Sequence, residues 1–333
     1  MNIGRSAQSA IRGQKSTRVG GVRRAGLLSA IGIALAAVAL AAVVPSVVDA
    51  QRRIARGHGG VVKVPRRYAV RTISDGRKLS TYDSLVLSQK PVMFLSMDTP
   101  SSGSQRDATG HGHTGTYFPS ASKPGLVRMP NGDAVAVFNG RTQYLEVPDS
   151  TALSVPKTGV LTISAWIRPD TLQFPTQEGT GYCNFLGKST HGEGRSEYEL
   201  RMYSKVNTEA PVRPNRISAY CFNLSGGCGS GSSFQDPISV GEWIMVTEVI
   251  NTRVKTTKMP TGYVRIYKGG TVRGTVSLTQ YNTTPQHATA PFRVAALAPP
   301  GYSYFMGAIG KVAVFDYELS AAQVAAQYAA MTR

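Results

Sequence analysis

The chain has 333 residues, a hydrophobic content of 41% and a formal net charge of +18 at pH 7. Fifteen of its 37 Lys and Arg residues, against only Asp49 and Asp75, lie in residues 1–78, which leaves the rest of the chain with a net charge of only +5. The charge therefore belongs to an N-terminal tail rather than to a nucleic-acid-binding domain, and we expect no nucleic-acid partner. The remaining length suits one domain with a substantial core.

The tail contains an uncharged apolar run from Ala25 to Val48, preceded by a basic flank in residues 1–24. The run is long enough to span a bilayer, and basic flanks normally stay on the cytoplasmic side. Two interpretations remain open. The run is either a transmembrane anchor with the following domain outside, or a signal peptide cleaved after Ala50, which would release a secreted protein. The pair Arg23-Arg24 also matches part of a twin-arginine export address.

Residues 49–78 form a basic linker, in which Gly57, Gly59, Gly60 and Pro65 disfavour regular structure. Its charge would keep it extended and solvated. It is either a plain spacer or a segment that lies along an anionic surface such as acidic lipid head groups or a wall polymer.

The pattern after the linker is typical of β-strands. Val135, Val137, Leu145 and Val147 belong to β-prone runs separated by the turn signal Asn139-Gly140. A longer run alternates between two faces, with Leu161, Ile163, Ala165 and Ile167 on the core face and Thr162, Ser164 and Trp166 on a mixed face.

Four segments in this order, YDSLVLSQKPVMFLSMD, DATGHGHTGTY, AVAVFNGRTQYLEVPDS and LTISAWIRPD, resemble the laminin-G-like, concanavalin A-like jelly-roll family of lectins and glucanases. GEWIMVTEVI with Trp243, GYVRIYKGGTV and the closing GAIGKVAVFDYELSAAQVAAQYA extend the resemblance over about Lys78 to Met331. The resemblance implies that residues 79–333 form an all-β, two-sheet antiparallel jelly-roll sandwich with a short C-terminal helix, preceded by the hydrophobic helix and the basic linker.

The C-terminal helix has its own start signal. Ser320 and Gln323 have the spacing of a capping box, and Leu319 and Val324 that of a hydrophobic staple. Val324 and Tyr328 share one helix face, which we expect to pack on the sandwich edge.

Binding residues are expected in the Gly-, Ser- and Pro-rich insertions 174–182, 189–196, 225–234 and 299–304, because loops at a sandwich rim are adaptable surfaces. Their aromatic side chains would stack on sugar rings or anchor a protein interface, unless they pack down their own loops. The candidate ligand-binding residues are Tyr182, Phe234, Tyr302 and Tyr304.

The resemblance also implies a calcium site, with Asp98 and Asp107 as oxygen donors at the sandwich edge. In the closing strand, however, Gly310 and Lys311 stand where the family usually has two acids. The alternative is that Asp107 only shapes a tight loop by hydrogen bonds to the backbone.

The three cysteines allow one disulfide, for which Cys221 and Cys228 around a short loop are the candidates. Such a bridge would stabilise the fold by about 2–3 kcal/mol. Cys183 would then be a free thiol, and we expect it to be buried. The spacing does not match a zinc site.

Nothing in the sequence predicts an enzyme. Glu197 and Glu199 alternate on one strand as carboxylates of a glycan hydrolase do, but we expect both on the solvent face with Tyr198 and Leu200 inside. The five His residues lie in expected loops, and neither a G-x-S-x-G elbow nor a phosphate-binding loop occurs.

Two classes of function remain. The first is an exported, surface-attached module that binds a glycan or an envelope protein through rim loops. The second is a structural subunit of a surface assembly, with the basic tail as an anchor, Cys183 as an interchain link and an oligomeric state. A glycan hydrolase is the distant third.

Overall fold

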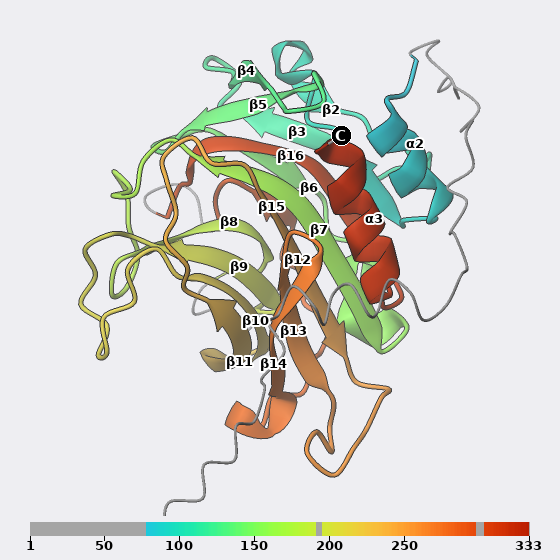
Figure 1. Ribbon diagram of the computed structural model, residues 1–333, viewed down its shortest axis with the longest axis vertical. Helices are drawn as coiled ribbons and strands as arrows, with labels where there is room; N and C mark the ends of the chain where they lie inside the picture. Colours follow the sequence, from blue (N-terminus) through green and yellow to red (C-terminus); the bar gives the residue numbers. More distant parts are fainter. Residues whose placement is uncertain (1–77, 191–194, 298–302, 333) are drawn as a thin grey trace, which may run out of the picture. The chain divides into compact units, whose positions relative to one another are not determined.

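The computed structural model describes residues 78–190, 195–297 and 303–332 (Figure 1). They form two antiparallel sheets that pack face to face, which confirms the predicted fold class. Sheet I has the order β14-β13-β12-β7-β16-β5-β4, with β1 also paired to β16, and sheet II has the order β11-β10-β9-β8-β15-β6-β3-β2.

The strands of sheet I are β1 (Met93–Leu95), β4 (Gly125–Arg128), β5 (Ala134–Asn139), β7 (Val160–Pro169), β12 (Ile244–Asn251), β13 (Tyr263–Lys268), β14 (Thr271–Ser277) and β16 (Met306–Phe315). Those of sheet II are β2 (Ser104–Gln105), β3 (Gly115–Phe118), β6 (Tyr144–Val147), β8 (Tyr182–Lys188), β9 (Tyr198–Tyr203), β10 (Ile217–Asn223), β11 (Gly226–Phe234) and β15 (Phe292–Val294). The helices are α2 (Thr81–Ser88) and α3 (Ala321–Met331), with short 3-10 turns at η1 (Pro100–Ser102), η2 (Thr151–Leu153), η3 (Val155–Lys157) and η4 (Leu278–Tyr281).

Strand β7 shows why the hydrophobic pattern produces this sandwich. It lies between β12 and β16, and the alternating residues predicted for the core, Leu161, Ile163, Ala165 and Ile167, are all fully buried. The opposite face of β7 carries Trp166, whose indole Nε1 donates to Tyr82 Oη of α2 at 3.2 Å. Two helices therefore cover the outer face of sheet I, while sheet II is on the side away from them (Figure 1).

Helix α2 is absent from the sequence-based expectations, which placed only one helix in the domain. Ser80 caps it by accepting a hydrogen bond from the backbone N of Asp83 at 3.2 Å. The helix is short and lies beside a β-rich pattern, and Tyr82 and Val86 become buried only because sheet I and α3 pack against them. Tertiary contacts rather than local periodicity make it a helix.

Helix α3 begins as predicted. Ser320 and Gln323 form the capping box, and both Leu319 and Val324 are fully buried. Tyr328 stacks on Trp166 at 5.7 Å between ring centroids, so this helix face packs on the sheet as expected.

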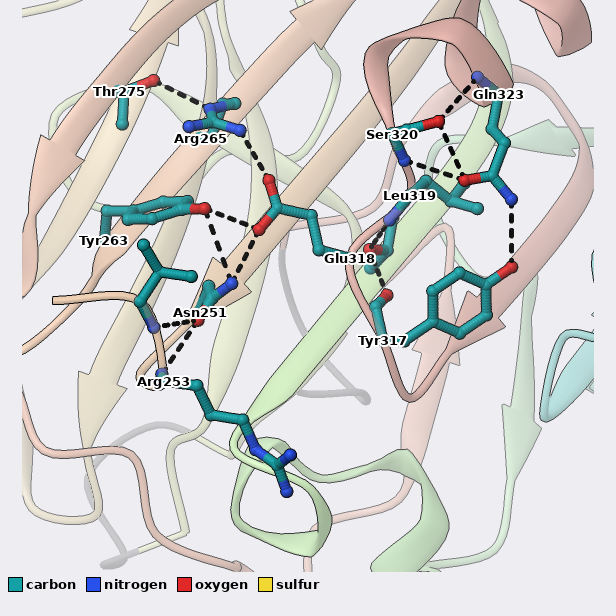
Figure 2. Close-up of polar contacts among 12 residues, drawn as sticks. Asn251, Arg253, Tyr263, Arg265, Thr275, Tyr317, Glu318, Leu319, Ser320 and Gln323 are labelled. Atoms are coloured by element: carbon teal, nitrogen blue, oxygen red, sulfur yellow. Dashed lines mark hydrogen bonds and ion pairs between the residues drawn. The ribbon is translucent and has the colours of Figure 1, made fainter.

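The turn before α3 is fixed by Glu318, which lies at the centre of the polar network in Figure 2. Its Oε1 accepts from Arg265 at 2.6 Å, and its Oε2 accepts from Asn251 at 2.6 Å and from the Tyr263 hydroxyl at 2.5 Å. Burial, with the Glu318 carboxylate, raises the pKa of Tyr263 to about 12, so the phenol keeps the proton that it donates. This network attaches the helix to β12 and β13 and is structural.

The predicted apolar segment Ala25–Val48 and most of the basic linker lie outside the described residues. Within the part of the chain that the structure describes, we find no helix with the length and apolar character needed to span a membrane.

Candidate functional site

The outer face of sheet II carries a cluster of aromatic and arginine side chains. In β9 and β10 every second residue belongs to the core, namely Tyr198, Leu200, Met202, Ile217, Ala219 and Cys221. Because side chains alternate along a strand, the intervening Arg201, Tyr203, Tyr220 and Phe222 point to the opposite face.

Arg201 is the centre of this cluster. Its guanidinium lies 4.3 Å from the ring centroid of Tyr182 in β8 and 4.0 Å from that of Tyr220 in β10. Phe222 is a third ring, at 6.0 Å. A cation held between aromatic faces gains about 0.5–2 kcal/mol for each contact, so the arginine orders the rings around it.

Electrostatics keep this arginine charged. Burial alone would lower the pKa of Arg201, but the neighbouring Glu199 carboxylate and tyrosine rings outweigh it and hold the pKa above its usual range. The Nε atom of Arg201 is buried and has no hydrogen-bond partner among the described residues.

Glycines in β11 make room for the rings. Tyr220 pairs directly with Gly231 across the strands, and a Cβ built on Gly231 would lie 2.2 Å from Tyr220 Cδ1. A Cβ on Gly229 would lie 2.6 Å from Phe222 Cε1. The Gly- and Ser-rich segment predicted as a loop is therefore mostly an edge strand whose missing side chains let two aromatic rings lie flat on the sheet.

The variant Gly231→Ala tests this packing. We expect it to destabilise the domain by about 1–3 kcal/mol, as overpacking does, because the added methyl group displaces the Tyr220 ring. Thermal unfolding measures the loss. Gly125→Ala in β4 is the matched control, because nothing lies within 4 Å of a Cβ there. Equal melting temperatures for the two variants would contradict the packing role.

Two adjoining cavities lie over this face, and we call them together the sheet II groove. One has a volume of about 280 Å³ and is lined by Tyr182, Arg201, Tyr203, Glu209 and Cys228 among others. The other has a volume of about 350 Å³ and is lined by Arg216, Ser232, Thr275 and Gln280 among others. Arg213, Tyr220, Gly229 and Tyr281 line both.

The loop after β9 closes one side of the groove. Glu209 Oε1 pairs with Arg213 at 2.8 Å, and its Oε2 accepts from the Thr180 hydroxyl at 2.6 Å. The Arg213 guanidinium lies 5.9 Å from the Tyr203 ring centroid. On the opposite side Tyr281 of η4 is 48% exposed, so the junction of the two cavities presents an accessible aromatic face.

The aromatic residues predicted to bind a ligand do not lie together at one site. Tyr182 lines the groove, but Phe234 is buried at the end of β11 under Lys268 and Arg273. Tyr304 is also buried, 6.3 Å from the Tyr144 ring centroid, and Tyr302 lies outside the described residues.

The carboxylates of Asp98 and Asp107 accept hydrogen bonds from other groups of the protein. Asp107 is buried, and its carboxylate accepts from the backbone N of Phe94, Thr109 and His113 and from the Thr109 hydroxyl. Asp98 accepts from Ser96 and Gln105. Among the described residues no group of three or more His, Cys, Asp or Glu could hold a metal ion. This donor set does not fit the calcium site implied by the resemblance.

Lys311 of β16 forms ion pairs with two acids other than the predicted calcium donors. Its Nζ lies 2.5 Å from Asp83 Oδ1 of α2 and 2.7 Å from Asp133 Oδ2. Lys311 therefore ties helix α2 to the β16 strand, where the family usually has acids.

The structure does not contain the predicted disulfide. Cys183, Cys221 and Cys228 are free thiols, with Cys221 buried in the core and Cys228 exposed at the groove. The hairpin register places Cys221 opposite Ser230, so hydrogen bonds between β10 and β11 close this hairpin without a bridge. Burial raises the pKa of Cys183, which is the inert core thiol that we expected.

The expectation that Glu197 and Glu199 face solvent is wrong, because both side chains are almost wholly buried. Glu197 accepts from Lys188 Nζ, and Lys188 also lies 2.8 Å from Asp149 Oδ1. Burial raises the pKa of Glu197, and the Lys188 ammonium opposes that shift. Lys188 is fully buried, so this cluster is an ion-pair network inside the fold.

The same cluster contains a serine, a histidine and an acid in contact. Ser154 Oγ lies 2.8 Å from His287 Nδ1, and His287 Nε2 lies 3.4 Å from Asp149 Oδ2. Ser154 is only 1% exposed and donates to Glu197 at 2.9 Å. Its hydroxyl is therefore not presented to a substrate, and we assign the contact a structural role.

Glu248 is a buried acid that has no hydrogen-bond partner among the described residues. Glu248 in β12 pairs across the strands with the core residue Ile163, is fully buried, and has no hydrogen bond to either carboxylate oxygen among the described residues. Burial, followed by the nearby Glu199, raises the pKa of Glu248 well above its usual value, which favours its protonated form in the folded protein.

Sequence reasoning missed Arg201, Tyr203, Arg213, Tyr220 and Tyr281. The alternation in YELRMY and ISAYCFN is a usable signal, since it places Arg201 and Tyr203 on one face of their strand and Tyr220 and Phe222 on one face of theirs. The local sequence does not show that the two strands pair so that these faces lie on the same side of the sheet.

The two-sheet antiparallel sandwich defines the class of fold. In agreement, the family model of the concanavalin A-like lectin/glucanases superfamily matches residues 139–325, more than half of the chain. The chain belongs to this superfamily. A search of curated protein sequences finds no match.

Several solved structures are similar. Domain 4 of an extracellular arabinanase from Geobacillus stearothermophilus, solved with arabinotriose, is 17% identical with a TM-score of 0.48, covering 72% of this chain and 98% of that one. The botulinum neurotoxin serotype D ligand binding domain in complex with N-acetylneuraminic acid is 12% identical with a TM-score of 0.50, covering 74% and 52%.

The binding domain of botulinum neurotoxin DC in complex with rat synaptotagmin II is 12% identical with a TM-score of 0.51, covering 73% of this chain and 51% of that one. The match thus spans about half the length of the toxin domains. At these identities the likeness shows the fold alone.

Proposed function

We propose that the domain is a glycan-binding module and that the sheet II groove is its binding site. The observation that carries this proposal is the half-exposed ring of Tyr281 at the junction of two cavities whose lining combines further tyrosines with arginine, serine, threonine, glutamine and glutamate side chains. Sugars are bound by this combination, because an aromatic ring covers the apolar C–H face while polar groups bond the hydroxyls. Membership of the superfamily and the fold shared with a domain solved with N-acetylneuraminic acid support the same class.

Binding without hydrolysis is part of the proposal. Glu197 and Glu199 are 2% and 1% exposed, so neither carboxylate is presented beside the groove as an acid or a nucleophile would be. Incubation of the purified protein with every oligosaccharide that it captures should release no new reducing ends. Steady release, abolished in Glu197→Gln or Glu199→Gln, would make the domain a hydrolase instead.

The binding test is an oligosaccharide array that contains neutral and acidic sugars, followed by titration of the strongest ligands. We expect Tyr281→Ala to weaken binding about fivefold, since the loss of one stacking ring is worth on the order of 1 kcal/mol. Tyr281→Trp should keep the affinity.

The control for this test is Leu126→Ala, because Leu126 is a similarly exposed apolar residue, 52% exposed, in β4 of the other sheet. Its affinity should be unchanged. Equal affinities for wild type, Tyr281→Ala and Leu126→Ala would remove the groove as the site.

A further inference from the structure

We propose that the sheet II groove selects acidic saccharides, and specifically that its arginines bind sugar carboxylates. This inference rests on the proposed function and adds the class of ligand. Among the described residues that line the groove, three are cationic, Arg201, Arg213 and Arg216, and only Glu209 is acidic.

Two acids face these three cations, Glu209 in the lining and Glu199, whose carboxylate interacts with Arg201. Both oxygens of Glu209 are engaged, one by Arg213 and the other by the Thr180 hydroxyl. The second cavity has Arg213 and Arg216 among its lining residues and no carboxylate among them. An anion that entered there would meet the Arg216 guanidinium and the Arg213 guanidinium, the latter of which already pairs with Glu209 from the adjoining cavity.

The arginines of the groove also have hydrogen-bond donors that lack an acceptor. The Nε atoms of Arg201 and Arg213 are buried and lack a hydrogen-bond partner among the described residues, whereas Arg216 Nε donates to Gln235 at 3.3 Å. Guanidinium groups with an N–H donor that lacks a partner favour a ligand that brings charge and acceptor oxygens. A carboxylate does so with the planar geometry that matches the arginine fork.

The aromatic rings restrict that anion to one attached to a sugar. Arg201 lies between Tyr182 and Tyr220, and Tyr281 lies exposed at the junction of the cavities. A free small anion would leave the exposed ring without a partner, whereas an acidic sugar uses the ring for its C–H face and the arginines for its carboxylate. Residues 79–333 carry a net charge of only +5, so attraction of anions by the domain as a whole is modest and the preference should arise at this cluster.

The experiment compares matched pairs of probes on the full chain by isothermal titration. The acidic members are oligogalacturonate, oligomannuronate and sialyllactose, and their partners are the two carboxyl-reduced oligosaccharides and lactose. At least one acidic probe should bind ten times or more as tightly as its partner, and the difference should shrink as salt rises.

Two variants connect the preference to the arginines. Arg216→Gln and Arg213→Gln should each lower the acid-to-neutral ratio several-fold while melting temperatures stay close to wild type, because a surface ion pair contributes little to stability. Arg213→Lys should recover only part of the ratio, since lysine keeps the charge but not the fork. Arg141→Gln, an exposed arginine in the β5–β6 turn, is the control and should leave the ratio unchanged.

The outcomes separate the two proposals. Equal affinity for acidic and reduced partners, with both weakened by Tyr281→Ala, would overturn the acidic preference and keep the glycan site. Binding of sulfated saccharides alone would also overturn the carboxylate assignment. Binding to no saccharide, acidic or neutral, would overturn the proposed function itself.

Discussion

Glu248→Leu is expected to stabilise the domain by about 2 kcal/mol at neutral pH, which for a domain of this size raises the melting temperature by about 4–8 °C. The reason is that Glu248 is fully buried between the sheets, with neither carboxylate oxygen hydrogen-bonded to a described residue. Folding therefore removes water from the Glu248 carboxyl group without replacing the lost hydrogen bonds by bonds to described residues. Leucine has a similar size and removes that cost.

The pH dependence identifies the cause. The folded state raises the pKa of Glu248 above the ordinary value of 4.5, so the folded chain keeps a proton that the unfolded chain releases. This contribution to stability is complete below about pH 4.5 and is lost as pH rises toward the folded pKa. Glu248→Gln cannot titrate, so its advantage over wild type should be small at acidic pH and grow toward neutral pH. A difference that stays constant with pH, or a loss of stability in both variants, would show that the carboxyl group has a partner in the folded protein.

Lys188→Met is expected to have the opposite effect and to destabilise the domain by about 3–5 kcal/mol. Lys188 is fully buried, and its Nζ contacts Glu197, Asp149 and the carbonyl of Ala288. Removing the ammonium leaves Glu197, itself 2% exposed, without its cation inside the fold. Chemical denaturation of wild type and variant measures the difference.

Two further variants make this test specific. Lys157→Met changes an exposed lysine of η3 and should alter stability by no more than about 0.5 kcal/mol. The double variant Lys188→Met, Glu197→Leu should recover much of the lost stability, because it removes the unpaired Glu197 carboxylate together with Lys188. Additive losses in the double variant would mean that Lys188 stabilises the fold by packing rather than by charge.

The parts of the fold predicted from the sequence are those in which one local pattern decides the structure. Leu161, Ile163, Ala165 and Ile167 alternate along one strand, and all four are buried in the core. The cap of α3 depends on residues three apart, and Ser320 and Gln323 make it. Helix α2 escaped prediction because its burial depends on α3 and on Trp166, which are far away in the sequence.

The candidate site was harder to predict because it is spread over strands that are distant in the chain. Tyr182 was selected as a loop aromatic, and the structure places it on Arg201 in the neighbouring strand. Glycines of β11 suggested a loop, since glycine weakens a strand, yet they are what allow Tyr220 to lie flat. In the sequence, a glycine that interrupts a strand cannot be told from a glycine that makes room for a neighbouring ring.

By itself the sequence determined the class of fold, the core face of each strong strand, the start of the last helix and the separation of a basic tail from a nearly neutral domain. The class of fold came from the resemblance of ordered segments to a known family, and the rest follow from periods of two and 3.6 residues and from the positions of charges, which are local properties. Only the tertiary structure decided that Glu197 and Glu248 are buried, that Lys311 pairs with Asp83 and Asp133, and that Tyr182, Arg201 and Tyr281 border one groove. Those outcomes depend on which strands pair and on what lies above each face, and the pairing of distant strands is a property of the whole chain.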